Sequence, residues 1–203
     1  VNMYTTFEEN GSPIANTSEL ETRPRTTYVN ENISLVTWKS GDDDARILYQ
    51  FVDENGLVFP EPRAISDYDA IQTGPRVKRS TTGDVFIQWT DLRQDPVDGD
   101  LYLQKIDVNG ERQWGDGIQV DPLDGVNFSG RFSADNNGGV NVFWERGVYP
   151  NIDILFQSFN DLGAAVLDEP IFISNAPGYQ FAPNTISSNA GGVFAIYADQ
   201  GSG

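Results

Sequence analysis

The 203-residue sequence contains no cysteine and no histidine. The lack of cysteine excludes a disulfide framework and thiol chemistry. The lack of histidine removes the commonest general base, the commonest zinc ligand and the Ser-His-Asp arrangement together. Any catalysis would have to use carboxylates, tyrosine, lysine or serine, so composition alone argues against an enzyme.

Basic residues are also scarce, with 13 Lys and Arg against 30 Asp and Glu, and the net charge is −17. Binding to nucleic acid depends on Lys and Arg contacts with phosphates, so we expect no nucleic-acid partner. No apolar run is long enough to cross a membrane, and we expect no direct membrane insertion. The acidic charge indicates either solubility in a salty exterior or a surface for cations or a basic partner.

A repeat of about fifty residues runs through the chain, a period typical of repeat β architectures. An aromatic residue marks each copy, and the four are separated by 51, 55 and 53 residues: Trp38, Trp89, Trp144 and Tyr197. Each stands 14 residues after a matched chain break, at Pro24, Pro75, Gly130 and Pro183. Self-similarity of this kind, built from strand-like pieces, predicts a propeller or a related β array.

A second series of turns lies in phase with the first. Its members are Asn10-Gly11, Asn55-Gly56, Asn109-Gly110 and the degenerate Leu162-Gly163. Asn-Gly predicts two-residue type I′ hairpins, because both central positions of that turn need a positive φ. A glutamine precedes three of these turns at matched positions: Gln50, Gln104 and Gln157. Each unit therefore contains four antiparallel strands, which is the pattern of a propeller blade.

The predicted fold class is all-β, a β-propeller of four-stranded antiparallel blades in a single domain. Three whole blades cover 25–75, 76–130 and 131–183, and half-blades cover 1–24 and 184–203. Two arrangements would protect the edges of the half-blades. Either the termini pair and close a four-bladed ring, or the chain is a segment of a larger propeller. We favour the segment, because chains seldom begin on a strand without a leader; pairing of 1–7 with 192–197 would establish the ring.

The anchor aromatics Trp38, Trp89, Trp144 and Tyr197 are candidate ligand-binding residues, because exposed aromatic faces stack on sugar rings. The alternative is that they cap the core of each blade. Their repetition in phase with the strands favours packing.

Acidic residues gather in two loops that follow the first two anchors, and we consider them as a calcium site: Asp42, Asp44, Asp95, Asp98 and Asp100. Carboxylate oxygens in Gly-containing loops suit Ca²⁺, which is the one candidate cofactor. However, Asp and Gly are also favoured in tight turns for backbone reasons, and we prefer that interpretation.

No catalytic residues can be assigned. Propeller glycosidases use unlike carboxylates near the axis, and the sequence places no such pair there. The pairs Glu8-Glu9 and Asp53-Glu54 recur in phase before the Asn-Gly turns. A recurrent pair indicates a turn element, because a catalytic pair normally occurs once.

The unit over 83–120 carries a longer motif: W-x-D-x-R, then D-[IL]-Y-x-Q-[KR]-[IL]-D-x-N-G, then W-G-x-x-G-x-x-V. Its residues include Trp89, Asp91, Arg93, Gln104 and Trp114. This pattern resembles a repeat common in large secreted bacterial proteins, many of them from Bacteroidetes and often exported by the type IX system. The resemblance implies a propeller and an extracellular or cell-surface location, and it implies no reaction.

The sequence therefore predicts a non-catalytic binding or scaffold module of an exported bacterial surface protein. Its expected partner is either a protein of a surface assembly or a glycan. The alternative is a carboxylate-based hydrolase or lyase that acts on glycans.

Overall fold

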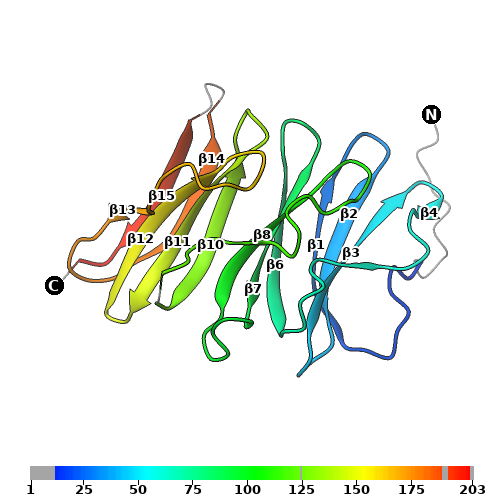
Figure 1. Cartoon of the computed structure of the whole chain (residues 1–203), viewed down its shortest axis with the longest axis horizontal. Helices are drawn as coiled ribbons and strands as arrows, with labels where there is room; N and C mark the ends of the chain where they lie inside the picture. The colour runs from blue at the N-terminus through cyan, green and yellow to red at the C-terminus, as the bar shows by residue number, and fades with distance from the viewer. Residues whose placement is uncertain (1–11, 124, 189–191, 202–203) are drawn as a thin grey trace.

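The computed structural model describes residues 12–123, 125–188 and 192–201. These residues form antiparallel sheets and contain no helix, so none that could cross a membrane. Figure 1 shows the sheets standing side by side, with the first at one end of the array and the fourth at the other. The all-β prediction is confirmed.

Each sheet is a meander whose strands pair in sequence order. The first contains β1 (Glu21–Tyr28), β2 (Ser34–Ser40), β3 (Arg46–Asp53) and β4 (Gly56–Leu57), with β5 (Arg63–Ala64) also paired to β3. The second contains β6 (Gln72–Arg79), β7 (Val85–Asp91), β8 (Asp100–Ile106) and β9 (Ile118–Gln119). The third contains β10 (Asn127–Ala134), β11 (Val140–Val148), β12 (Asn151–Phe159) and β13 (Ile171–Ser174). The fourth contains β14 (Gln180–Ser187) and β15 (Val193–Asp199).

The four anchor aromatics occupy equivalent places, as the repeat predicts. Trp38, Trp89, Trp144 and Tyr197 are each the fifth residue of the second strand of their sheet. In the first three sheets the anchor lies opposite a residue of the third strand, such as Tyr102 opposite Trp89. The period in the sequence is thus the period of the sheets.

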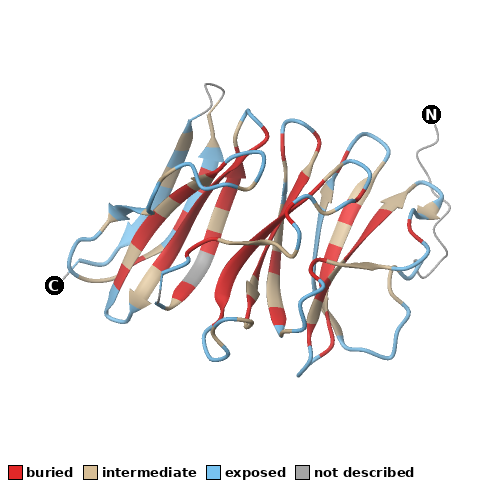
Figure 2. Ribbon diagram, viewed as in Figure 1, coloured by how far each residue is buried: buried red, intermediate tan, exposed pale blue. Residues whose placement is uncertain are grey.

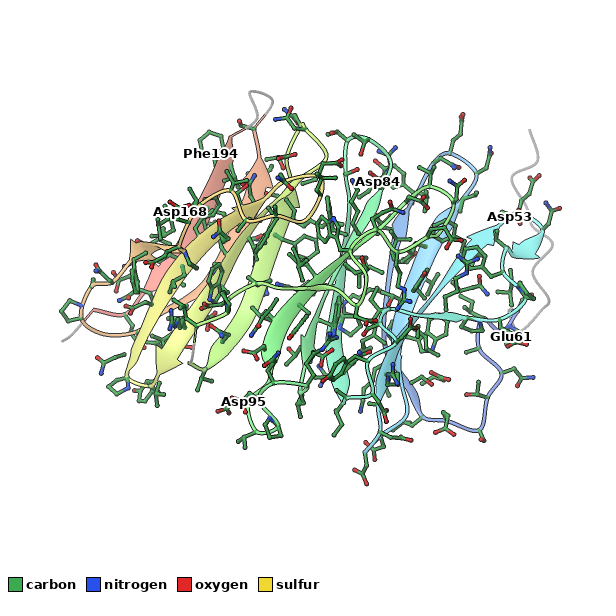
Figure 3. All side chains as sticks on the ribbon, in the orientation of Figure 1. Asp53, Glu61, Asp84, Asp95, Asp168 and Phe194 are labelled. Atoms are coloured by element: carbon green, nitrogen blue, oxygen red, sulfur yellow. The ribbon has the colours of Figure 1, made fainter. Side chains whose placement is uncertain are left out.

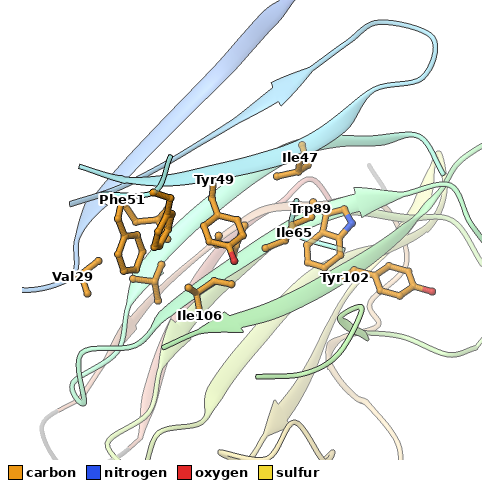
Figure 4. Close-up of a cluster of buried hydrophobic side chains, with 12 residues drawn as sticks. Val29, Ile47, Tyr49, Phe51, Ile65, Trp89, Tyr102 and Ile106 are labelled. Carbon is orange, nitrogen blue, oxygen red and sulfur yellow. The ribbon is translucent and has the colours of Figure 1, made fainter. Parts of the chain in front are cut away.

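The hydrophobic core lies between neighbouring sheets, so inner sheets are apolar on both faces. One cluster joins the first and second sheets and includes Tyr49, Ile65 and Trp89 (Figure 4). The next joins the second and third sheets and includes Phe86 and Trp144. Buried residues follow one another along the middle strands in Figure 2. A free antiparallel sheet would instead have one polar face.

The fourth sheet is covered on one face only. Phe194 and Ile196 are 67% and 72% exposed, whereas the matched Phe86 and Gln88 of the second sheet are buried (Figures 2 and 3). The described residues do not close into a ring, since the first and fourth sheets lie at opposite ends. The strand expected to close it, 1–7, lies outside the described residues.

The predicted type I′ turns are wrong. Asn55 and Asn109 do not have a positive φ, and only the glycine after each has one, 117° at Gly56 and 82° at Gly110. The amide of Gly110 donates to the carbonyl of Asp107 at 3.0 Å, and the Asp107 carboxylate accepts from the amide of Asn109 at 2.9 Å. This is a type I turn followed by a left-handed glycine. Asn10-Gly11 lies outside the described residues.

The matched glutamines perform one structural task in three sheets. Gln104 Oε1 accepts the amide of Trp114 at 2.9 Å, and its Nε2 donates to the carbonyl of Gly115 at 2.8 Å. Gln50 and Gln157 also accept an amide and donate to a carbonyl in their own sheets, in each case the amide and carbonyl of one residue, Phe59 and Leu167. Each side chain satisfies backbone groups after the tight turn, where the fourth strand is short or displaced.

Gly117 has a packing role that a substitution can test. Its φ is +92°, and a Cβ there would lie 2.4 Å from a ring carbon of the buried Trp89. Gly115 also has a positive φ, but no atom lies within 4 Å of its Cβ position. We expect Gly117→Ala to lower the free energy of unfolding by about 2–5 kcal/mol, because strain and overpacking add. Gly115→Ala should cost about 1–2 kcal/mol from strain alone. Urea unfolding of both variants measures this, and equal losses would contradict it.

Candidate functional site

The first strand of every sheet contains a β-bulge at the same place. The register shifts at the residues expected to be chain breaks, Pro24, Pro75, Gly130 and Pro183. These positions therefore lie inside β1, β6, β10 and β14, and the unit boundaries proposed from the sequence fall within strands. The sheets begin at the residues that open those strands, for example Glu21 and Gln72.

Unusual backbone conformations accompany these bulges. Arg23 and Ala182 have φ values of 55° and 53°, and Gly74, at the same place in β6, has 66°. A positive φ is uncommon outside glycine and marks a local constraint. Bulges re-aim the side chain that follows them. The residue that follows is an arginine in three of the four strands.

Those arginines meet at one cavity. Arg25 of β1, Arg76 and Lys78 of β6, and Arg131 of β10 line a space of about 170 Å³. Val77 and Phe132 supply its apolar surface. The fourth sheet has Asn184 at the matched position of β14. We call this space the arginine cavity.

A second cavity of about 340 Å³ adjoins the first, because Lys78 lines both. The first strands of all four sheets contribute to it, with Tyr28, Arg79, Ser133 and Ser187 among its lining. Its surface is rich in hydroxyl groups, so we call it the hydroxyl cavity. Neither cavity is lined by an aspartate or a glutamate.

Three of the basic side chains that line the arginine cavity lack an ion-pair partner among the described residues. They are Arg25, Arg76 and Lys78. Burial lowers the pKa of Arg76, and the charges of Arg131 and Arg25 lower it further. Burial and the charge of Arg131 lower the pKa of Lys78. The cavity therefore favours an anion, and a guanidinium can hold a carboxylate or a sulfate through two hydrogen bonds.

The anchor tryptophans do not form a sugar platform. Trp89 and Trp144 are buried between sheets, and Trp38 is buried on the first sheet beside Ile14 and Ala15. The stacking hypothesis is therefore wrong for these three, and packing is the better interpretation. Tyr197 is 37% exposed, on the fourth sheet.

The W-x-D-x-R motif also has a structural task. Asp91 Oδ2 accepts hydrogen bonds from Trp89 Nε1 at 2.9 Å and from Arg93 at 2.6 Å. Burial alone would raise the pKa of Asp91, but the hydrogen bonds from Arg93 and Trp89 outweigh it and lower that pKa. The Arg93 guanidinium also lies over the ring of Tyr102 in β8 and over that of Tyr68, in the connection between the first and second sheets. The motif therefore holds this connection against the second sheet.

The proposed calcium ligands do not converge. Asp95 accepts backbone hydrogen bonds from Val97 and Asp98 at 2.8 and 3.1 Å, as expected for a turn-forming residue. Asp95 lies at the end of the sheets opposite Asp84 (Figure 3). Asp100 is buried, and burial raises its pKa.

The other two proposed ligands lie in the loop of the first sheet, where Asp42 is 3.7 Å from Lys39 and Asp44 lies beside Gly41. Within the described ranges, no group of three or more Asp, Glu, His or Cys side chains could hold a metal ion.

Sequence reasoning missed the arginine cavity, although the signal is in the aligned repeats. The matched dipeptides are Pro-Arg, Pro-Arg, Gly-Arg and Pro-Asn, at 24–25, 75–76, 130–131 and 183–184. The recurrence of arginine after three of the four breaks is the feature that would have indicated it.

Comparisons with known proteins give structural relatives only. No protein-family model matches the chain, and no curated protein matches it by sequence. The endo-arabinase from Bacteroides thetaiotaomicron is similar with a TM-score of 0.55 and 15% identity, over 96% of this chain and 77% of that one. An ulvan lyase, a polysaccharide lyase, is similar with a TM-score of 0.52 and 11% identity, over 83% of this chain.

The ulvan lyase bound to -[GlcA(1-4)Rha3S]- gives a TM-score of 0.52 and 10% identity. The match covers 49% of the lyase, so this chain matches about half of its length. At these identities the likeness concerns the fold.

Acid should test the role of Asp91. Because its pKa is lowered in the folded state, its contribution to stability is complete above its unfolded pKa of about 3.9 and is lost as pH falls through the folded value. We expect Asp91→Asn to lower the free energy of unfolding by about 2–4 kcal/mol at pH 7, because a buried arginine loses its partner. The difference in free energy of unfolding between the parent and Asp91→Asn should become smaller towards pH 3. Urea unfolding at several pH values measures it, with the exposed Asp98→Asn as control; a constant gap would contradict the role.

Calcium should have no effect on thermal stability. The five candidate aspartates do not converge, so no binding energy is available to raise the melting temperature by mass action. We expect the same melting curve with millimolar Ca²⁺ and with a chelator. A rise that Asp98→Asn and Asp100→Asn together remove would restore the calcium hypothesis.

Proposed function

We propose that the protein is a carbohydrate-active β-propeller whose sheets are blades, from an exported bacterial surface protein, and that it acts on a glycan at the two cavities between its first strands. The observation that carries this proposal is that the residues after three matched bulges, Arg25, Arg76 and Arg131, line one cavity, and that all four first strands line the cavity beside it. The fold likeness to an endo-arabinase and to an ulvan lyase supports the choice of a glycan.

The position of the cavities supports the proposal on physical grounds. In a propeller the first strands face the central channel, where residues from successive blades come together. Here β6 contacts both β1 and β10, and β10 contacts β14. A ligand at this place would touch several blades at once. Binding sites are concave and few, and a space of a few hundred Å³ is within their usual range.

The residues present favour lyase chemistry over acid-pair hydrolysis. A hydrolase needs two carboxyl groups flanking the scissile bond, and neither cavity supplies one. A lyase needs a cation beside the carboxylate of a uronic acid and a base that removes the neighbouring carbon-bound proton. As that proton leaves, a C=C bond forms and the C–O bond on the next carbon breaks. The departing sugar oxygen takes up a proton, either from the protonated base or from water. The arginines can supply the cation, and Lys78, with its lowered pKa, can serve as the base.

A second candidate is a binding module without catalysis, which is the main prediction from the sequence. The absence of acidic residues from the lining of both cavities favours it, because the commonest carbohydrate-cleaving machinery is then missing. A protein partner in a surface assembly belongs to the same hypothesis.

A polysaccharide panel tests the proposal. The purified protein is incubated with arabinan, ulvan, polygalacturonate and alginate, and binding is measured by affinity electrophoresis. New reducing ends report cleavage by either mechanism, whereas ultraviolet absorbance of an unsaturated product reports only cleavage by elimination. We expect binding, and unsaturated products that Lys78→Met abolishes while binding remains. Binding without cleavage would leave the non-catalytic module, and failure to bind any glycan would refute the proposal.

A further inference from the structure

Basic residues are concentrated at one place in an acidic protein. Five of the 13 Lys and Arg residues line the two cavities. They are Arg25, Arg76, Lys78, Arg79 and Arg131. Seven of the remaining eight have an aspartate or glutamate within ion-pair distance: Lys39, Arg46, Arg63, Arg93, Lys105, Arg112 and Arg146. Arg25, Arg76 and Lys78 form no ion pair with any described residue, so they depart from the general pattern of a chain with 30 carboxylates.

Holding these charges together is costly. Arg76 is half-buried and feels the positive charges of both Arg25 and Arg131. Like charges that share a partly buried site repel each other, and burial removes the water that would screen them. An anionic ligand would relieve this repulsion, so the apo cavity is preorganised for one.

The backbone conformation of the first strands orients the three arginine side chains. Each follows a bulge, and β1 accepts a positive φ at Arg23 to form it. Strained backbone of this kind persists where the surrounding structure enforces it, often at binding sites. Because the three arginines come from three sheets, they can approach one anionic group from separate directions.

We propose that Arg25, Arg76 and Arg131 together bind an acidic group of the glycan, either a uronate carboxylate or a sulfate ester, while the hydroxyl cavity holds the adjoining sugar. This inference rests on the proposed function and names its substrate class, an anionic polysaccharide.

The chemistry of the two cavities favours a glycan over other polyanions. A nucleic acid carries a charge at every phosphate, and a protein with a net charge of −17 repels it. An anionic glycan has fewer charges and many hydroxyl groups. The hydroxyl cavity offers matching partners in Ser80, Thr81 and Ser133. The ring of Tyr28 lies beside them, with the Arg79 guanidinium 4.9 Å from its centroid.

Titration calorimetry on the whole chain tests the anion site. The probes are a uronate oligosaccharide, a sulfated oligosaccharide without uronate, and a neutral arabino-oligosaccharide. The variants are Arg25→Gln and Arg76→Gln, and the matched control is Arg63→Gln, which removes the same charge from an ion pair with Glu111 outside both cavities. We expect each cavity variant to weaken binding of at least one anionic probe by about tenfold or more, as loss of a buried charge contact does. Arg63→Gln should bind as the parent does.

Melting temperature separates a binding role from a structural one. Arg25 is exposed, and within the described part of the chain its side chain donates only to the carbonyl of Pro24, so Arg25→Gln should have the melting temperature of the parent. Arg76→Gln should melt at the same or a higher temperature, because repulsion is relieved. Anionic probes bound equally by parent and cavity variants would overturn the inference. Binding of the neutral probe alone would also overturn it, while leaving the proposed function intact; no glycan binding at all would remove both.

Discussion

The structure depends on the burial of large aromatic side chains between neighbouring sheets. Trp89 and Trp144 are wholly buried at the same place in successive sheets, each on the face that meets the preceding sheet. An indole there removes a large apolar area from water, which is the main favourable term in stacking sheets. Because the second and third sheets are each packed on the preceding sheet by the same residue at the same place, their first strands are brought side by side. The cavities between those strands are a consequence of this packing.

Repetition also explains how a site can arise without disturbing the core. The side chains at the matched position of β1, β6 and β10 line one shared cavity, so a substitution at this position in one repeat changes one part of that cavity's lining. Arginine fills three of these positions and asparagine the fourth. None of the four is an anchor of the hydrophobic core. The chemistry of the cavity can therefore vary while the stack of sheets is retained.

The sequence predicts the features that depend on local pattern. Strand order, period and the place of the anchors follow from alternating apolar residues and turn glycines, and the structure agrees with them. The bulges at Pro24 and Pro75 could not be predicted, because a proline in a sequence usually indicates the end of a strand. Here each proline lies inside a strand, at a bulge. The arginine cavity is harder to predict, since its members are more than fifty residues apart in sequence and meet only when the sheets stack; the only sign of it is arginine at the matched positions of three repeats.

The unequal cover of the sheets has a consequence for how unfolding would be observed. All four tryptophans, Trp38, Trp89, Trp114 and Trp144, belong to the first three sheets or their connections, and the two-stranded fourth sheet has none. That sheet also exposes Phe194 and Ile196, so it has the least apolar contact to lose and the lowest free energy of local opening. Its amide protons should exchange with solvent first. Indole fluorescence would report the later unfolding of the first three sheets and would not detect the opening of the fourth.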